Sequence, residues 1–333
     1  MLRQDDDPRS ALKGALSAIL SSPDFLYIQS NSQAAAAIDD NDIDPGQYAL
    51  ASRLSYFLWS SMPDERLLQA ARRGILDRED VIKKETKRML KDPKSDAFAQ
   101  HITDSWLELH KLGTAPPDAK RFKSYSVRNL EPQMRQETQL FFQYILDKNR
   151  DVSEFIDSDY TFLDEDLAEH YQIPDIAGSD FRRVTLPEDS IRGGLMGQAS
   201  ILTATANGIE TSPVVRGVWV LENILGTPPS PPPPNINLIE PDTRGATTIR
   251  ERLIKHQNVA TCAECHTKID PPGFALEAFN PVGQFREFYQ DDKGKDTLEI
   301  DTQVTLHSGE SVQNLRELRT NFCKAAKINS YWD

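Results

Sequence analysis

Two cysteines and a histidine lie close together in the last third of the chain, in the run Cys262-Ala263-Glu264-Cys265-His266. Two thiols three positions apart on one turn can each form a thioether bond with a vinyl group of haem. The histidine directly after them can supply an imidazole nitrogen to the iron. The spacing therefore predicts covalent haem c, with Cys262 and Cys265 as attachment points and His266 as the proximal iron ligand.

The same residues leave two other interpretations open. Cys262 and Cys265 would also suit a redox-active or structural disulfide, although no βαβ pattern precedes them as a thioredoxin-like site requires. They would also supply half of a zinc site. The only other cysteine is Cys323, however, and the sequence has no second C-x-x-C and no H-x-x-x-H. A free cysteine pair would not need the adjacent histidine, so covalent haem is the leading interpretation.

The sixth ligand of the iron is the undecided part of this prediction. No methionine follows His266, and the last methionine of the chain is Met196. Met196 and His307 are therefore the candidates, because His256 precedes Cys262 too closely on the same helix to cross the ring. Otherwise the position is open or filled by a segment outside this chain. A methionine raises the reduction potential, a second histidine lowers it, and an open position permits peroxide or small-ligand chemistry.

Elements on both sides of the motif are expected to position it. The run Thr248-Ile249-Arg250-Glu251 is a capping box that opens a helix leading to the thiols. After the motif, residues 269–276 are expected to form a proline turn. In that turn Pro271 and Pro272 present a backbone carbonyl to the outer nitrogen of His266, which fixes the orientation of the ring. The apolar residues that follow would line the haem or form ordinary core: Phe274, Leu276, Phe279, Val282 and Phe285.

Most of the remaining chain has the apolar spacing of amphipathic helices. One helix is expected to begin at Asp64 and to end at Gly74, a left-handed cap. The other main helices are predicted over residues 47–59, 77–90, 95–112, 130–146, 163–171 and 213–225. His101, His110 and His170 lie on these helices without a second ligand at metal spacing, so we expect surface or capping roles for them.

Two segments depart from the helical pattern. Residues 183–186 predict a short strand, and a β-hairpin is expected around residues 292–295. The polyproline segment 228–234 cannot join a helix or a sheet ladder, and we interpret it as a stiff strap that leads to the haem helix. The fold class is therefore mainly α. A helical N-terminal domain is followed by a small cytochrome c-like, mostly helical domain with a short β-hairpin.

Composition limits the partners and the compartment. A net charge of −13 argues against nucleic acid as a partner and would suit a basic redox protein. No apolar run approaches the ~20 residues of a transmembrane helix, and the first residues are not a signal peptide. Because c-type haem is attached in an exported compartment, we expect that the chain lacks its natural N-terminus and that the native protein is periplasmic or in the cell envelope.

Three stretches of the chain resemble a known group of proteins. Residues 54–59, residues 216–223 with the proline run, and residues 262–277 resemble large planctomycete and verrucomicrobial proteins. Those are built from consecutive domains of unknown function that carry a cytochrome c motif. The resemblance covers about residues 8–325 and implies haem and export, with further modules before this chain. It implies no particular reaction.

A domain division is also expected, its ends from the resemblance and its middle from the change in sequence character at Phe181. Residues 1–30 look like the tail of a preceding helical module, and residues 31–180 form a helical domain. Residues 181–305 form the cytochrome c-like, haem-binding domain with the polyproline strap. Residues 306–333 look like the start of a truncated C-terminal module.

Three functions are compatible with these features. The leading one is an exported c-type haem protein that transfers electrons to an unidentified redox partner. The second is a haem-dependent oxidoreductase or peroxidase-like enzyme with an open or weak sixth ligand. The third is a surface scaffold or binding module in which haem or a disulfide has a structural role. The sequence contains no G-x-S-x-G, H-E-x-x-H, P-loop or dinucleotide fingerprint.

Overall fold

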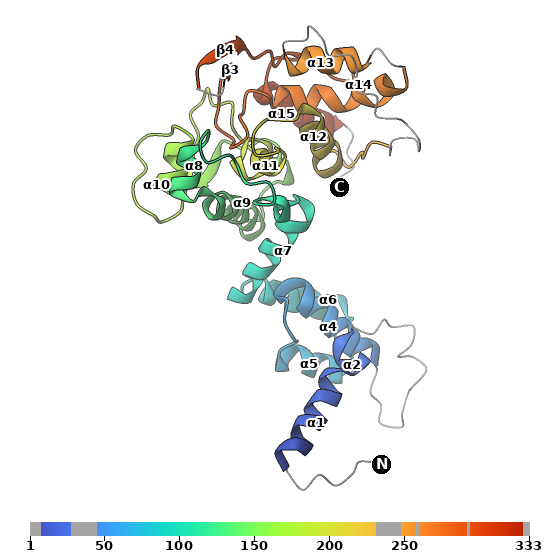
Figure 1. The fold of residues 1–333 in the computed structure, drawn as a ribbon. Helices are drawn as coiled ribbons and strands as arrows, with labels where there is room; N and C mark the ends of the chain where they lie inside the picture. The colour runs from blue at the N-terminus through green and yellow to red at the C-terminus, as the bar shows by residue number, and fades with distance from the viewer. Residues whose placement is uncertain (1–7, 28–44, 231–247, 258–259, 292–293, 329–333) are drawn as a thin grey trace. The chain divides into compact units, whose positions relative to one another are not determined.

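The computed structural model describes residues 8–27, 45–230, 248–257, 260–291 and 294–328 (Figure 1). The protein is mainly α, as the sequence predicts, and its strands form three short two-stranded antiparallel sheets within the described residues. The chain divides into two compact units, residues 1–100 and residues 101–333. No helix in the described part is both long and apolar enough to span a bilayer.

The first unit contains only helices among its described residues. They are α1 (Pro8–Leu20), α2 (Pro23–Leu26), α4 (Pro45–Trp59), α5 (Glu65–Arg72), α6 (Glu79–Met89), the 3-10 helix η1 (Pro93–Ser95) and the start of α7 (Asp96–Trp106). The predicted ends of α5 are confirmed. The carboxylate of Asp64 accepts a hydrogen bond from the Leu67 backbone nitrogen at 2.9 Å, and Gly74 has a φ of 64° just after the helix.

The core of the first unit lies between α4, α5 and α6. Trp59 is buried, and its indole nitrogen donates to the backbone oxygen of Met89 at 2.9 Å. Glu85 is also buried, and its carboxylate accepts hydrogen bonds from Arg66 and Arg88, each at 2.7 Å. The carboxylate is therefore paired on both oxygens, which offsets much of the cost of burying it.

The second unit begins with a helical half. Its elements are η2 (Leu109–Lys111), α8 (Lys123–Arg128), α9 (Leu130–Asp147), η3 (Val152–Phe155), β1 (Tyr160–Leu163), α10 (Glu165–His170) and β2 (Arg182–Thr185). The buried face of α9 includes Phe141 and Ile145, as its apolar spacing predicts. The predicted strand is present as β2, which pairs antiparallel with β1, a strand that the sequence pattern does not indicate.

The second half of this unit carries the motif. Its elements are η4 (Leu195–Gly197), α11 (Ala199–Ala204), α12 (Pro213–Trp219) continued by the π-helix η5 (Val220–Ile224), α13 (Ile249–Gln257), α14 (Ala260–Ala275), β3 (Phe288–Gln290), β4 (Asp296–Glu299), β5 (Val304–Thr305), β6 (Ser311–Val312) and α15 (Leu315–Ile328). The predicted β-hairpin is present as β3 and β4. Residues 231–234 of the predicted strap lie outside the described residues.

Two tryptophans connect α7 to α12 and η5. The indole nitrogen of Trp106 donates to the backbone oxygen of Asn223 at 2.7 Å, and that of Trp219 donates to the backbone oxygen of Leu107 at 3.2 Å. Trp219 is buried in the main core of the second unit, and Trp106 packs against that core. The end of α7 and the end of α12 are therefore joined by reciprocal hydrogen bonds across the core.

Candidate functional site

The Cys-x-x-Cys-His motif lies in the first two turns of α14. Cys262, Cys265 and His266 are all partly exposed, and neither Cys262 nor Cys265 forms a disulfide. Positions three and four apart on a helix lie next to each other on one face. The helix therefore brings both thiols and the imidazole to one face. The helix α13 packs beside α14 (Figure 1).

A carboxylate fixes the orientation of the histidine. The Nδ1 atom of His266 lies 2.9 Å from Oδ1 and 3.1 Å from Oδ2 of Asp270, one helical turn further on. A carboxylate only accepts hydrogen bonds, so Nδ1 carries the proton. In the neutral imidazole the lone pair is then on Nε2, the form in which histidine binds metals through that nitrogen.

The same carboxylate is held from the neighbouring helix. Asp270 is 2% exposed, and the side-chain nitrogen of Gln257, at the end of α13, donates to its Oδ2 at 2.8 Å. Asp270 therefore accepts from a histidine on its own helix and from an amide on another. Sequence reasoning missed both Asp270 and Gln257. The signal that was available is the spacing of His266 and Asp270, four residues apart on one helix.

The expected proline turn is not formed, so the expected role of Pro271 and Pro272 in supporting His266 is wrong in its geometry. The helix α14 continues through both prolines to Ala275, and the group on Nδ1 is a carboxylate rather than a backbone carbonyl. Each proline removes one helical donor, which leaves the carbonyls of Thr267 and Lys268 without their usual partner. Both of these residues are exposed, so water can solvate the carbonyls at low cost.

Close packing against α12 accounts for the continued helix. A β-carbon on Gly217 would lie 1.8 Å from the backbone oxygen of Ile269, and one on Gly273 would lie 1.8 Å from that of Pro213. The two backbones therefore touch at both glycines. This contact positions α14 along the turns that contain Pro271 and Pro272.

The residues after the motif are mostly core. Phe274, Leu276 and Phe279 are buried in the main cluster of the second unit, and the guanidinium carbon of Arg250 lies 4.2 Å from the centre of the Phe274 ring. Val282 is buried in a second cluster, whereas Phe285 is 40% exposed. The structure therefore favours the core interpretation for the first four of these side chains.

The two candidate sixth ligands have different surroundings. Met196 is fully buried in η4 and belongs to the same core cluster as Phe274. His307 is exposed in the turn between β5 and β6. The side chain of His256, on α13, lies outside the described residues. No group of three or more histidine, cysteine, aspartate or glutamate side chains is arranged to hold a metal ion in the part that the structure describes.

A buried ion pair closes the C-terminal end of α14. Arg216 and Glu277 are both 0% exposed, and the guanidinium of Arg216 donates to the backbone oxygens of Leu276 and Phe279, each at 2.8 Å. Glu277 accepts from Arg286 at 3.0 Å and from the hydroxyl of Thr211. Burial lowers the pKa of Arg216 to about 10 and raises the pKa of Glu277. Arg216 thus satisfies backbone carbonyls of the turn that follows α14.

A second buried polar cluster lies around Glu137 on α9. Its carboxylate accepts from the hydroxyls of Thr161 and Tyr171, each at 2.5 Å, and burial raises its pKa to about 7. The guanidinium of Arg192 lies 3.8 Å from the centre of the Tyr171 ring. His170, for which a surface or capping role is expected, is buried, and its Nε2 donates to the backbone oxygen of Val282 at 2.7 Å. Burial lowers the pKa of His170 to about 4.

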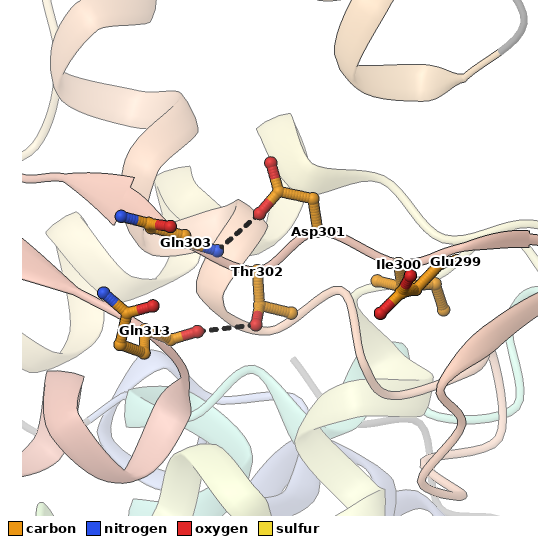
Figure 2. Close-up of a pocket in the computed structure, with 6 residues that line it drawn as sticks. All are labelled: Glu299, Ile300, Asp301, Thr302, Gln303 and Gln313. Atoms are coloured by element: carbon orange, nitrogen blue, oxygen red, sulfur yellow. Dashed lines mark hydrogen bonds between the residues drawn. The ribbon is translucent and has the colours of Figure 1, made fainter.

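A shallow polar pocket of about 450 Å³ lies beside α13 (Figure 2). It is lined by Glu299, Ile300, Asp301, Thr302, Gln303 and Gln313. Figure 2 shows the Thr302 hydroxyl bonded to the Gln313 backbone oxygen at 2.6 Å. The guanidinium of Arg250 donates to the backbone oxygens of Asp301 and Gln303. The pocket contains none of the predicted site residues.

Two segments of the chain match families of unknown function. Residues 46–173 match the family described as PSD4, Protein of unknown function (DUF1592), and residues 192–289 match the family described as PSCyt3, Protein of unknown function (DUF1588). These matches support the expected arrangement of consecutive domains of unknown function, and the name of the second refers to cytochrome-like domains. No curated protein and no solved structure matches the chain.

The two matched segments meet inside the second unit. The segment similar to PSCyt3 contains α12, α13 and α14, and so contains the motif, Gln257 and Asp270. Glu137 and Tyr171 come from the segment similar to PSD4, whereas Arg192 comes from the other. The buried cluster around Glu137 is therefore a contact between the two. The three domain boundaries expected from the sequence, at residues 30/31, 180/181 and 305/306, stay predictions.

Proposed function

We propose that the chain is part of an exported c-type haem protein that transfers electrons. Cys262 and Cys265 form the thioether bonds to haem, and His266 is the proximal iron ligand. The haem assignment, which both candidate functions share, rests on two thiols and His266 on one face of α14, with His266 Nδ1 paired to the buried carboxylate of Asp270 one turn further on. Electron transfer is placed first because the sequence contains no other catalytic fingerprint.

The residues present fit this cofactor in their donor chemistry. A bound haem supplies a one-electron iron couple. Cys262 and Cys265 are partly exposed, so their sulfur atoms can be reached by a large planar group during attachment. Asp270 holds the proton of His266 on Nδ1 and leaves the lone pair on Nε2, and Gln257 holds Asp270 from α13. The backbone contact between α12 and α14 keeps this group of side chains in one place.

The partner and compartment follow from the same proposal. Haem c attachment implies export to the periplasm or cell envelope. With a net charge of −13, a basic redox protein is the partner that long-range electrostatics would favour.

A haem-dependent oxidoreductase is the second candidate, and one observation favours it. A histidine that donates to a buried carboxylate is a stronger electron donor than one that donates to a neutral carbonyl. Electron-rich axial ligands favour the cleavage of oxygen–oxygen bonds over simple electron transfer. Met196 and His307 remain the proposed sixth ligands for the electron-transfer function, and an open position would suit the enzyme.

The deciding experiment is attachment of haem in a periplasm that contains the cytochrome c maturation system. We expect the purified chain to retain haem after denaturation and to give a reduced pyridine haemochrome spectrum of the c type. The matched control is the double variant Cys262→Ser/Cys265→Ser, which should lose covalent haem and keep its helical circular dichroism. A wild-type chain without covalent haem under these conditions would rule out both haem functions.

A spectrum of the loaded protein separates the two functions. A low-spin ferric spectrum that peroxide leaves unchanged supports electron transfer. A high-spin ferric spectrum that changes with peroxide supports the enzyme instead.

A further inference from the structure

We propose that Asp270 is a positioning residue for His266, and that it holds the reduction potential of the bound haem low. The inference rests on the proposed haem function and adds to it the residue that controls the electron density of the iron ligand. Asp270 would act through His266 and would touch neither the iron nor the porphyrin.

The first argument is the burial of the carboxylate. A histidine and an aspartate four residues apart on an exposed helix face would add little to the stability of the helix. Asp270 is instead 2% exposed, and a buried carboxylate is costly unless it is paired and hydrogen-bonded. The fold pairs it with His266 and with Gln257, which belongs to another helix.

The second argument is the geometry at the imidazole. Both carboxylate oxygens lie within 3.1 Å of Nδ1, so the proton on that nitrogen interacts with the full negative charge. A charge-assisted hydrogen bond of this kind is roughly twice as strong as a neutral one. It would increase electron donation through Nε2, the nitrogen that would bind the iron.

The third argument is the direction of the electrostatic effect. Ferric iron carries one more positive charge than ferrous iron. A nearby negative charge and a more basic ligand both stabilise the ferric form relative to the ferrous form. Both effects therefore lower the potential of the one-electron couple, and low solvent exposure leaves the charge of Asp270 little screened.

The test is a redox titration of the haem-loaded full chain and of Asp270→Asn. This substitution keeps the size and an acceptor oxygen but removes the charge. We expect at least a tenfold rise in the ferrous-to-ferric ratio at a given potential, equivalent to an increase of about 59 mV for one electron. The matched control is Glu264→Gln, which removes an exposed charge from the same helix and should change the ratio less than threefold.

A second pair of variants covers the case in which Asp270→Asn fails to fold or to load. Asp270→Glu and Asp270→Gln have the same length and differ by one charge, so the Gln variant should have the higher potential. Equal potentials within either pair of loaded proteins would overturn the inference and leave the haem function intact. A wild-type chain that attaches no haem would overturn the proposed function, and this inference with it.

Discussion

The hydroxyl of Tyr171 donates to Oε2 of Glu137 at 2.5 Å, and both side chains are buried. The same hydroxyl accepts from the backbone nitrogen of Ala199 at 2.7 Å. Tyr171 thus joins α9 to α11, and with them the segments similar to PSD4 and PSCyt3. A carboxyl group at this junction makes the stability of the second unit depend on pH.

The pH dependence of Glu137 has a defined sign. Burial raises its pKa from 4.5 to about 7 on folding. Between these values the folded chain holds a proton that the unfolded chain has released, so stability falls as pH rises, by up to about 1.4 kcal/mol per pH unit. His170 has the opposite effect, because burial lowers its pKa from 6.5 to about 4 and stability rises with pH between those values.

We expect the two effects on the free energy of unfolding to offset each other in the wild-type protein between pH 4.5 and 6.5. From pH 6.5 to about pH 7 the free energy of unfolding should fall, because only the effect of Glu137 remains. Glu137→Gln removes the contribution that makes stability fall as pH rises. The free energy of unfolding of this variant should therefore rise with pH up to about 6.5 and then level off. Urea unfolding across this range measures the profiles. Glu188→Gln, at an exposed position, is the control and should follow wild type. Parallel profiles for Glu137→Gln and wild type would contradict the prediction.

The glycine contact between α12 and α14 predicts a destabilising substitution. Gly217→Ala places a methyl group against the Ile269 carbonyl, which is backbone and cannot rotate away. We expect a loss of ~1–3 kcal/mol, as for other overpacked sites, measured by urea unfolding. The control is Gly14→Ala in α1, where a β-carbon meets nothing within 4 Å. That substitution should be neutral or stabilising, and a Gly217→Ala protein as stable as wild type would contradict the close contact.

Replacing Arg216 should cause a large loss of stability, and a second substitution, at Glu277, should restore part of it. Arg216→Met removes the donor to four backbone carbonyls and leaves Glu277 with one cationic partner fewer. The expected cost is ~3–5 kcal/mol, which is typical of breaking a buried ion pair from one side. Adding Glu277→Gln removes the buried charge and should recover part of the loss. Thermal unfolding of the single and double variants measures the coupling, and strictly additive losses would exclude it.

Substitutions of the two sixth-ligand candidates, Met196 and His307, should differ in how much they destabilise the chain. Met196→Ala should destabilise the chain by ~2–5 kcal/mol because the side chain is fully buried, whereas His307→Ala should be within ~0.5 kcal/mol of wild type. Met196→Leu nearly preserves the volume and should cost less than about 1.5 kcal/mol. In the haem-loaded chain, the substitution that converts a low-spin spectrum to high-spin identifies the ligand. A stable Met196→Ala protein would contradict the packing described for η4.

The helices were largely predictable from the sequence because their signals are local. The apolar spacing of α9 and the caps Asp64 and Gly74 act within a few residues, and they agree with the structure. The strand β1 is not indicated by the sequence, since a strand of four residues depends on its partner β2, which follows only after α10. Strand pairing is a tertiary contact, and no local pattern specifies it.

The missed site residue has a similar explanation. Two consecutive prolines normally end a helix, so the pattern favoured a turn after the motif. Contact between Gly273 and the Pro213 carbonyl holds the backbone helical instead. Only on a continuous helix does Asp270 lie one turn above His266, and only with α13 beside it does Gln257 reach that carboxylate. A tertiary contact therefore decided which group faces the histidine.

The reciprocal tryptophan hydrogen bonds have a mechanical consequence. They connect residues that are 112 and 117 positions apart in the chain, so a load applied at the end of α7 takes this short route into α12. From α12 it passes to α14 through backbone contact at two glycines, with no flexible side chain between to absorb it. A pulling force applied at Trp106 would therefore reach α14, which carries the thiols, through these contacts and not along the chain between Trp106 and Trp219.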